Sequence, residues 1–555
     1  MSYDSRPLRE YMEHGFTYQA GFVRNVRRFG RSVAMMDPAS RRRWTYRELS
    51  EEVERLASVL AGCGVGRGDH FAFDLFNTPQ FAICYLAAHR LGAVGTVLNC
   101  RLAPGELAQA LLDARPTVFI YDAEIAGNAL EGVGMARSQA PGVASHLFQV
   151  RPAGARPELP DGVEDFDEAV ASAQPPAPGL PADFSSYEEV VRLYTSGTTG
   201  MPKGVPIASM VDVMSAHDVI MHFPLGPEDR TLNMTPWFHR GGLHSGGPCP
   251  VFYVGGSLVP MREFDADRVL DWVRHYNLTF LVGAPTTLEA LAVAQEARPR
   301  DLSTLRGIVT MGAPLDAYAA ERYMSLLTPR IFNGYGTTET FWNTFLRPSD
   351  LPRMAGSAGR PSTDDDVIVV RSLPDRMAEP DELAAKDNVE IGEVAMRSPK
   401  CGWAYSGENG AADPKFHSGW FYPGDLATWD EDGFVTIVGR KDEMLISGGE
   451  NVFPAQVEAV LETCPGVSQA MVVGAPDPHW GQRVVAYVVA DGVSAEELDA
   501  HCLASEKLAR FKRPRGYRFV PEIPMTATGK KKHVDGARMA ADDASRGRFI
   551  VPGRH

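Results

Sequence analysis

The chain has 555 residues, of which 44% are hydrophobic and 23% are charged. This is the composition of a folded globular protein, and the length exceeds that of one ordinary domain, so two or more domains are expected. The formal net charge of −15 disfavours a nucleic-acid partner, because binding to phosphates draws on a concentrated excess of Lys and Arg.

Residues 45–140 alternate between helix and strand patterns, which favours an α/β fold with parallel strands. Two helices and two strands are predicted there: Tyr46–Cys63, Pro79–Leu91, His70–Leu75 and Gly95–Leu98. The glycine cluster at 62–68 follows a helix and precedes a strand, the reverse of the order in a dinucleotide-binding turn, so we interpret it as a turn. Residues 137–184, rich in Pro, Ala and acidic side chains, are predicted to be irregular surface structure.

A loop rich in hydroxyls and glycines follows an apolar strand-like run between Tyr194 and Val205. Glycines let backbone N–H groups turn toward one anion, Ser and Thr add hydroxyl donors, and Lys203 supplies a positive charge. The loop is not a Walker A motif, because no Gly-Lys-Ser/Thr follows at the required spacing. A bland Ser/Thr/Gly linker is the alternative. We predict a phosphate-binding loop formed by Thr195, Ser196, Gly197, Thr198, Thr199, Gly200 and Lys203.

Further apolar segments each end in a loop that contains Gly or Thr, which is where open α/β sheets place ligand contacts. These segments are Leu278–Val282, Gly307–Met311 and Arg330–Phe332. After Arg440 the pattern changes to a small α+β arrangement. Its predicted elements are helices at Pro454–Glu462 and from about Ser494 to Ala509, and strands near Ala470–Val473 and Val484–Val489.

The phosphate loop and several later motifs closely resemble those of the adenylate-forming superfamily, which includes acyl-CoA synthetases, aryl-CoA ligases, peptide-synthetase adenylation domains and firefly luciferase. The motifs run from about residue 190 to 532 in family order. The resemblance implies an α/β fold with a large multi-layer N-terminal domain of parallel-rich sheets, residues 1–439, that binds AMP and the acyl group. A small mobile α+β C-terminal domain, residues 440–555, would turn on a hinge near Asp442.

The segment Ile331–Glu339 resembles the family's nucleotide-binding and metal-binding motif. The Tyr335 ring can stack on adenine, and Glu339 offers a hard oxygen ligand for Mg²⁺ on ATP phosphates, although a lone Glu after a turn is more often solvent-exposed. Asp425 and Arg440 take the places of the family's ribose contacts. The predicted ATP and AMP contacts outside the phosphate loop are Gly312, Ala313, Pro314, Asn333, Gly334, Tyr335, Gly336, Thr337, Asp425, Arg440 and Lys530.

The segment Pro524–Lys530 is similar to a family loop that carries a lysine, with Met525 in place of Arg. The resemblance implies that Lys530 is catalytic, because its charge would offset charge that develops as a carboxylate attacks phosphorus. Together with Lys530, the predicted catalytic residues are Lys203, Glu339 and His239.

The Ser-Gly-Gly-Glu-Asn loop that starts at Ser447 is like that of acyl-CoA and aryl-CoA ligases and unlike that of peptide-synthetase domains. Paired glycines leave room for a pantetheine arm, whereas a simple turn is the alternative. The predicted CoA contacts are Gly448, Gly449, Trp480, Phe511, Arg513 and Arg515, with Lys512 in the same basic run.

The segment from Pro236 to Leu243 resembles the loop that gates the acyl pocket, although His239 could instead be a core histidine. The predicted pocket residues are Trp237, Phe238, His239, Gly312, Gly336, Phe341 and Trp342. Because these side chains are bulky, a compact aromatic, alicyclic or medium-chain acid is favoured over a long chain.

The sequence therefore predicts an ATP-dependent acid–CoA ligase that uses ATP, Mg²⁺ and CoA, with a small carboxylic acid as its substrate; a homodimer stays open. One alternative is an adenylation enzyme that loads a carrier protein, which the glycine loop disfavours. The other is a non-catalytic nucleotide-binding regulator, which the retention of five site residues argues against: Lys203, Glu339, Asp425, Arg440 and Lys530.

The seven cysteines are scattered and contain no C-x-x-C pair, so they indicate neither a disulfide framework nor a zinc site. The N-terminus is polar, and no stretch offers about eighteen uninterrupted apolar residues. We therefore predict no export, no spanning helix and a cytoplasmic location.

Overall fold

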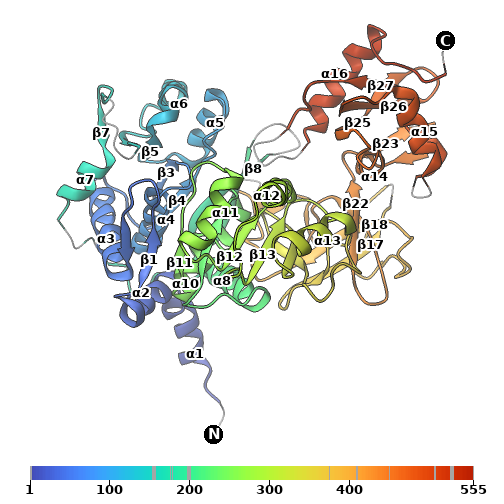
Figure 1. Ribbon diagram of the computed structural model, residues 1–555. Coiled ribbons are helices and arrows are strands. Elements are labelled where there is room, and N and C mark those ends of the chain that lie inside the picture. The colour runs from blue at the N-terminus through green and yellow to red at the C-terminus, as the bar shows by residue number, and fades with distance from the viewer. Residues whose placement is uncertain are drawn as a thin grey trace. The chain divides into compact units, whose positions relative to one another are not determined.

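A computed structural model describes residues 3–152, 158–174, 177, 179–196, 202–373, 375–407, 410–448, 450–505, 508–525 and 531–553 (Figure 1). Its contacts divide the chain into two compact units. Unit 1 comprises Met1–Val367 and Met396–Phe421, and unit 2 comprises Ile368–Ala395 and Tyr422–His555. The domain boundary at residue 440 and the hinge near Asp442 stay predictions.

The larger sheet of unit 1 has nine strands in the order β16-β15-β14-β13-β12-β10-β11-β1-β2. From β14 to β1 all neighbours are parallel, whereas β15, β16 and β2 pair antiparallel at the two edges. Central strands such as β12 are buried throughout, which explains their uninterrupted apolar sequences. The strands are β1 (Val33–Met36), β2 (Arg43–Thr45), β10 (Arg230–Asn233), β11 (Ser257–Leu258), β12 (Phe280–Gly283), β13 (Gly307–Met311), β14 (Ile331–Thr337), β15 (Phe341–Leu346) and β16 (Arg360–Pro361).

A second sheet of unit 1 has seven strands in the order β7-β6-β5-β3-β4-β8-β9. All neighbours are parallel except β8 and β9, which form an antiparallel pair. The strands are β3 (His70–Asp74), β4 (Val94–Val97), β5 (Val118–Asp122), β6 (His146–Val150), β7 (Val163–Asp165), β8 (Glu189–Ser196) and β9 (Pro202–Ala208). Unit 1 also contains the short hairpin β19 (Phe416–His417) and β20 (Trp420–Phe421).

The helices of unit 1 pack on these two sheets. Helices α11, α12 and α13 lie over one face of the nine-stranded sheet (Figure 1). Helix α4 is buried along almost its whole length, because it packs against α3, β4 and β8, and its sequence is accordingly apolar on all sides. The helices are α1 (Arg6–Glu10), α2 (Tyr18–Phe29), α3 (Tyr46–Gly62), α4 (Pro79–Leu91), α5 (Pro104–Ala114), α6 (Ala126–Gln139), α7 (Phe166–Ser172), α8 (Ser209–His222), α9 (Arg240–His244), α10 (Pro248–Val254), α11 (Ala266–His275), α12 (Pro285–Ala297) and α13 (Ala317–Leu326), with short turns η1 (Tyr11–Gly15), η2 (Ala123–Ile125) and η3 (Gly410–Ala412).

Unit 2 is built on a sheet in the order β24-β23-β26-β25, with β27 paired to β26. Alternate residues of β25 face opposite sides: Ala470 packs with α14 and α15, whereas Met471 packs with α16. A second set of strands pairs Asp425 of β21 with Arg440 of β22. The elements are β21 (Asp425–Trp429), β22 (Val435–Arg440), β23 (Leu445–Ser447), β24 (Glu450–Val452), β25 (Val467–Asp477), β26 (Gly481–Ala490), β27 (Tyr517–Phe519), α14 (Pro454–Leu461), α15 (Ala495–Ala504), η4 (Arg510–Lys512) and α16 (His533–Ser545). Strands β17 (Asp366–Arg371) and β18 (Gly392–Arg397) each begin in one unit and end in the other.

The α/β class and the predicted elements of residues 45–98 are confirmed within a residue or two. The prediction of irregular structure over 137–184 was wrong, because β6, β7 and α7 lie within that stretch. The stretch is rich in Pro and acidic residues, but it also contains short strands that extend the edge of a parallel sheet. The last predicted helix of the small domain ends at Ala504 rather than at Ala509.

A second correction concerns the segment after Phe332, where the strand was predicted to end in a loop. Strand β14 continues to Thr337 and pairs with β15, so the motif lies in a hairpin. A Cβ at Gly336 would meet the carbonyl of Phe341 at 1.7 Å. The glycine is therefore required by the close approach of the next strand.

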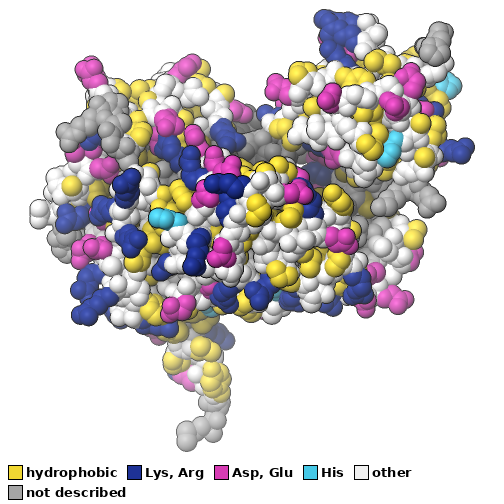
Figure 2. Space-filling model, viewed as in Figure 1, with side chains coloured by type: hydrophobic (Ala, Val, Ile, Leu, Met, Phe, Trp, Pro, Cys, Tyr) yellow, Lys and Arg dark blue, Asp and Glu magenta, His cyan; other side chains and the backbone are white. Residues whose placement is uncertain are grey.

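On the face drawn in Figure 2, Lys and Arg side chains are interspersed with Asp and Glu rather than gathered into one basic patch. Among the described residues, none of the helices combines the length and the apolar character needed to cross a bilayer.

Candidate active site

Lys203 lies on β9, where it pairs with Thr195 of β8, the first residue of the predicted phosphate loop. Its Nζ lies 2.6 Å from Oδ2 of Asp413 and 4.8 Å from the ring centre of Tyr405. Burial acts to raise the pKa of Asp413, but the hydrogen bonds from Lys203 and from the backbone N–H of Lys415, together with the charges of these two lysines, outweigh it, and the pKa lies below its ordinary value. The lysine and the carboxylate therefore form an ion pair beside the loop.

Tyr405 connects this ion pair to the predicted metal ligand. Its hydroxyl donates to Oε1 of Glu339 at 2.6 Å, and both side chains are buried. Burial, and then the charge of Glu339, raise the pKa of the Tyr405 hydroxyl well above its usual range, so it remains a donor. Among the described residues, the structure records no other hydrogen bond to the Glu339 carboxylate. Lys203 and Glu339, far apart in sequence, thus both contact Tyr405, the first at its ring and the second at its hydroxyl.

Asn333 lies on β14, two residues before Tyr335. Its Oδ1 is buried and has no hydrogen-bond donor in the part of the chain that the structure describes. Tyr335 itself is partly exposed. A buried acceptor without a donor is costly, so this position suits a ligand that supplies an N–H group.

Two glycines bring the His239 loop against the end of β13. A Cβ at Gly241 would lie 2.7 Å from Sδ of Met311, and one at Gly242 would lie 1.9 Å from the carbonyl of Pro236. Gly312 follows Met311 with a φ of +92°, in the region that favours glycine, and its surroundings are open. The predicted nucleotide loop at Gly312 and the predicted gate at His239 are therefore neighbours.

The aromatic residues predicted to line the acyl pocket are buried. Phe341 stacks on Trp342 with ring centres 4.7 Å apart, and the Trp342 indole N–H donates to Asp218. The ring centres of Phe238 and His239 lie 4.5 Å apart. Trp237 is fully buried and packs edge-on against a phenylalanine of α4, so it also serves the core.

Unit 2 holds the residues predicted to contact ribose and to form the hinge. The guanidinium of Arg440 donates to Oδ1 of Asp425 at 3.0 Å and to both carboxylate oxygens of Asp442, at 2.9 and 3.1 Å. One arginine thus joins the predicted ribose carboxylate to the predicted hinge carboxylate.

The predicted CoA residues of unit 2 form a partly exposed cluster. Gly448 has a φ of +62°, its N–H donates to the carbonyl of Trp480 at 2.9 Å, and a Cβ there would meet the indole at 2.6 Å. The Arg515 guanidinium lies 5.9 Å from the Trp480 ring, and that ring and Phe511 are each 40% exposed. Arg513 is instead paired with an aspartate of α15 at 2.8 Å. Trp480, Phe511 and Arg515 are therefore all at least partly exposed to solvent.

Several predicted residues fall outside the described parts of the chain: Gly197, Thr198, Thr199, Gly200, Gly449 and Lys530. Only the backbone of Ser196 is described.

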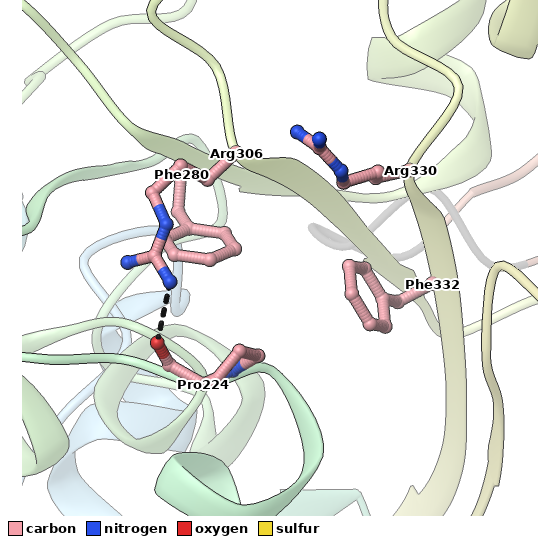
Figure 3. A pocket seen from close by; sticks show the side chains of 5 residues that line it. All are labelled: Pro224, Phe280, Arg306, Arg330 and Phe332. Carbon is pink, nitrogen blue, oxygen red and sulfur yellow. Dashed lines mark hydrogen bonds between the residues drawn. The ribbon is translucent and has the colours of Figure 1, made fainter.

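A separate hollow of about 360 Å³ lies at the amino ends of β12, β13 and β14 (Figure 3). It is lined by Pro224, Phe280, Arg306, Arg330 and Phe332, and Arg306 donates to the carbonyl of Pro224 at 3.2 Å. Gly312 follows the carboxyl end of β13, and Tyr335 and Glu339 lie at the carboxyl end of β14, so this hollow is not the candidate active site.

Sequence reasoning missed Tyr405 and Asp413, which lie outside the motifs that it used. Both precede the Trp420–Asp425 segment in a stretch without a regular hydrophobic period. Their only local signal is a tyrosine and an aspartate in a loop rich in Gly and Ala, which by itself predicts no partner.

Comparison with known proteins identifies the family of the chain. The model of the AMP-binding enzyme family matches residues 22–405, and that of the AMP-binding enzyme C-terminal domain matches residues 456–530. The chain therefore belongs to the AMP-binding enzymes. Within them it falls in the CoA-ligase branch and is an AMP-forming acid–CoA ligase, as its relatives indicate.

A feruloyl-CoA synthase of Amycolatopsis sp is 34% identical over 489 residues, which cover 88% of this chain and 92% of that protein. Among solved structures, the anthranilate CoA ligase AuaEII in complex with anthranoyl-AMP superposes with a TM-score of 0.82 at 27% identity, covering 96% of this chain and 98% of that one. The o-succinylbenzoate CoA synthetase MenE of Bacillus subtilis, in complex with ATP and magnesium ion, gives 0.79 at 26% identity, covering 93% and 99%.

Proposed function

We propose that this acid–CoA ligase acts on a compact carboxylic acid, aromatic in the first instance, and that Lys203, Glu339 and Asn333 hold ATP with Mg²⁺. The observation that carries the proposal is the convergence of Lys203 and Glu339 on Tyr405, because a phosphate-binding cation and a hard-metal ligand are needed in the same place.

The described residues fit both ligands. The buried Oδ1 of Asn333 would accept a hydrogen bond from the exocyclic amine of adenine, with the Tyr335 ring beside it. Glu339 has an oxygen that Tyr405 does not occupy, which suits Mg²⁺ coordination. When bound, Mg²⁺ would neutralise phosphate charge, and MenE was solved with ATP and a magnesium ion.

In the first step, the substrate carboxylate oxygen attacks the α-phosphorus and pyrophosphate leaves, which yields acyl-AMP. Lys530 would offset the charge that develops there, and Asp425 with Arg440 would hold the ribose. A rotation near Asp442 would then place Gly448 and Gly449 where they leave room for the pantetheine arm of CoA. The CoA sulfur attacks the acyl carbon, AMP leaves, and the thiol proton passes to solvent.

The proposed acid follows from the aromatic residues predicted to line the acyl pocket. Phe238, Phe341 and Trp342 are all buried and are fixed by ring contacts or by the bond to Asp218, so they would shape a short, flat pocket. Relatives named for feruloyl-CoA synthesis and for anthranilate support an aromatic acid. The proposal includes a cytoplasmic location, which the unpaired cysteines favour.

A pyrophosphate-release screen tests the substrate class. Benzoate, ferulate, cyclohexanecarboxylate, octanoate and palmitate are compared by kcat/KM, with and without CoA and with and without Mg²⁺. We expect the aromatic acids to give the highest kcat/KM, and we expect pyrophosphate release beyond a single turnover to require CoA. A preference for palmitate would refute the compact pocket, and multiple turnover with a carrier protein but not with CoA would favour the carrier-loading alternative.

A further inference from the structure

Arg240 is the first residue of α9. Its guanidinium donates hydrogen bonds to main-chain carbonyls of two segments that are distant in the sequence. Its Nη1 donates to the carbonyls of Thr338 and Glu339 at 2.6 and 3.1 Å. Its Nη2 donates to the carbonyl of Lys400 at 2.8 Å and contacts the hydroxyl of Ser215 at 3.4 Å. Only 3% of Arg240 is exposed, so these bonds form away from water, where they are strong.

The segments that Arg240 joins all carry residues of the proposed site. It directly follows His239 in the chain, its Nη1 holds the backbone of Glu339, and Lys400 lies five residues before Tyr405. Since Tyr405 binds the Glu339 carboxylate, the backbone and the side chain of Glu339 are fixed from two sides.

The Lys400 end of this connection is itself immobile. Its buried ammonium lies 2.9 Å from Oδ2 of Asp218 and 2.6 Å from Oδ2 of Asp365. Asp218 also accepts the indole N–H of Trp342. Arg240 therefore links the proposed acyl pocket to the proposed metal ligand through groups that cannot shift independently.

A buried carboxylate lies near Arg240. Asp212 accepts hydrogen bonds from Nε2 of His244 at 2.6 Å, from Nε2 of His89 at 2.9 Å and from the hydroxyl of Tyr85 at 2.8 Å. The short His244 to Asp212 distance is that of a hydrogen bond and is too close for two ligands of one metal ion. Burial lowers the pKa of the Arg240 guanidinium below its ordinary value, and the negative charge of Asp212 acts against that shift.

We propose that Arg240 is a positioning residue that holds the Glu339 carbonyl and the His239 loop in one geometry, so that the metal-holding carboxylate and the acyl pocket are formed together. The inference rests on the proposed role of Glu339 as the metal ligand.

The test replaces Arg240 by Lys and, separately, by Met. Lysine keeps the charge but cannot donate to both segments at once, and methionine keeps much of the volume. Arg262→Lys is the matched control, because Arg262 also makes two bonds, to Asp122 at 2.6 and 2.8 Å, in unit 1. Mn²⁺ binding in the presence of a non-hydrolysable ATP analogue is measured by electron paramagnetic resonance, beside the rates of the two half-reactions and the melting temperature.

We expect both Arg240 variants to bind Mn²⁺ roughly 10- to 100-fold more weakly, as losses of groups that orient metal ligands do, and to slow acyl-AMP formation more than thioester formation from supplied acyl-AMP. The Arg262→Lys control should change neither the Mn²⁺ affinity nor the rate of acyl-AMP formation. If Arg240→Lys melts like the parent and binds Mn²⁺ with unchanged affinity, or if both half-reactions fall equally, the inference is wrong.

Glu339→Gln separates this failure from failure of the proposed function. If Glu339→Gln weakens Mn²⁺ binding while the Arg240 variants do not, only the inference fails. If Glu339→Gln binds Mn²⁺ like the parent, the metal role of Glu339 fails first.

Discussion

Asp413→Asn is expected to tighten ATP binding. In the structure the Lys203 ammonium, one of the proposed phosphate contacts, is already paired with the Asp413 carboxylate at 2.6 Å. ATP must therefore compete with Asp413 for Lys203 and must also approach its negative charge. Asparagine keeps the shape and one acceptor for the backbone N–H of Lys415, but removes the charge.

The size of the effect follows from the exposure of the pair. One third of the Lys203 side chain is exposed, and pairs of this kind contribute only ~0.2–1 kcal/mol. Repulsion between a carboxylate and one phosphate charge about 4 Å away adds ~1 kcal/mol in a water-like medium. The sum of about 1–2 kcal/mol corresponds to a Kd for ATP that is roughly 5- to 30-fold lower.

Calorimetric titration with a non-hydrolysable ATP analogue measures this change. Asp366→Asn is the control, because it removes an equal charge from a surface pair with Arg397. In a Lys203→Met background the gain from Asp413→Asn should shrink to the repulsion alone. Weaker or unchanged ATP binding by Asp413→Asn would refute the view that Asp413 competes with phosphate for Lys203.

Three further predictions follow from named residues. Lys530→Ala should slow acyl-AMP formation ~10²–10³-fold and spare thioester formation from supplied acyl-AMP, and equal losses in the two assays would contradict it. Trp237→Ala should lower the free energy of unfolding by ~3–5 kcal/mol, because its indole is fully buried, and an accompanying shift of kcat/KM toward bulkier acids would assign Trp237 to the pocket as well. Burial acts to lower the pKa of His533, but Glu443 and Glu458 raise it to about 9, above the ordinary value near 6.5. The stabilisation by His533 is therefore complete below about pH 6.5 and lost as the pH rises through about 9. Urea unfolding of parent and His533→Gln at both ends of that range should show the difference between them vanish at high pH.

The sequence by itself determined the class of the fold and the kind of chemistry. The buried parallel strands around Phe71 and Leu281 could be predicted from their runs of apolar residues. Such runs arise because both faces of each strand are covered. The phosphate loop and the Tyr335 segment could be predicted because each gathers its polar and glycine residues within a few consecutive positions. Gly334 and Gly336 were predicted as nucleotide contacts, but their close packing against β15 was not predicted. That strand follows a turn that the hydrophobic periodicity does not reveal.

Only the tertiary structure decided which groups complete the site. Asp413 lies 210 residues from Lys203, Tyr405 lies 66 residues from Glu339, and Lys400 lies 160 residues from Arg240. A tyrosine, an aspartate or a lysine outside a motif carries no local pattern that identifies its partner. Their meaning arises when the sheets bring these loops together and exclude water, because a buried charge or hydroxyl must then find a partner within hydrogen-bond distance.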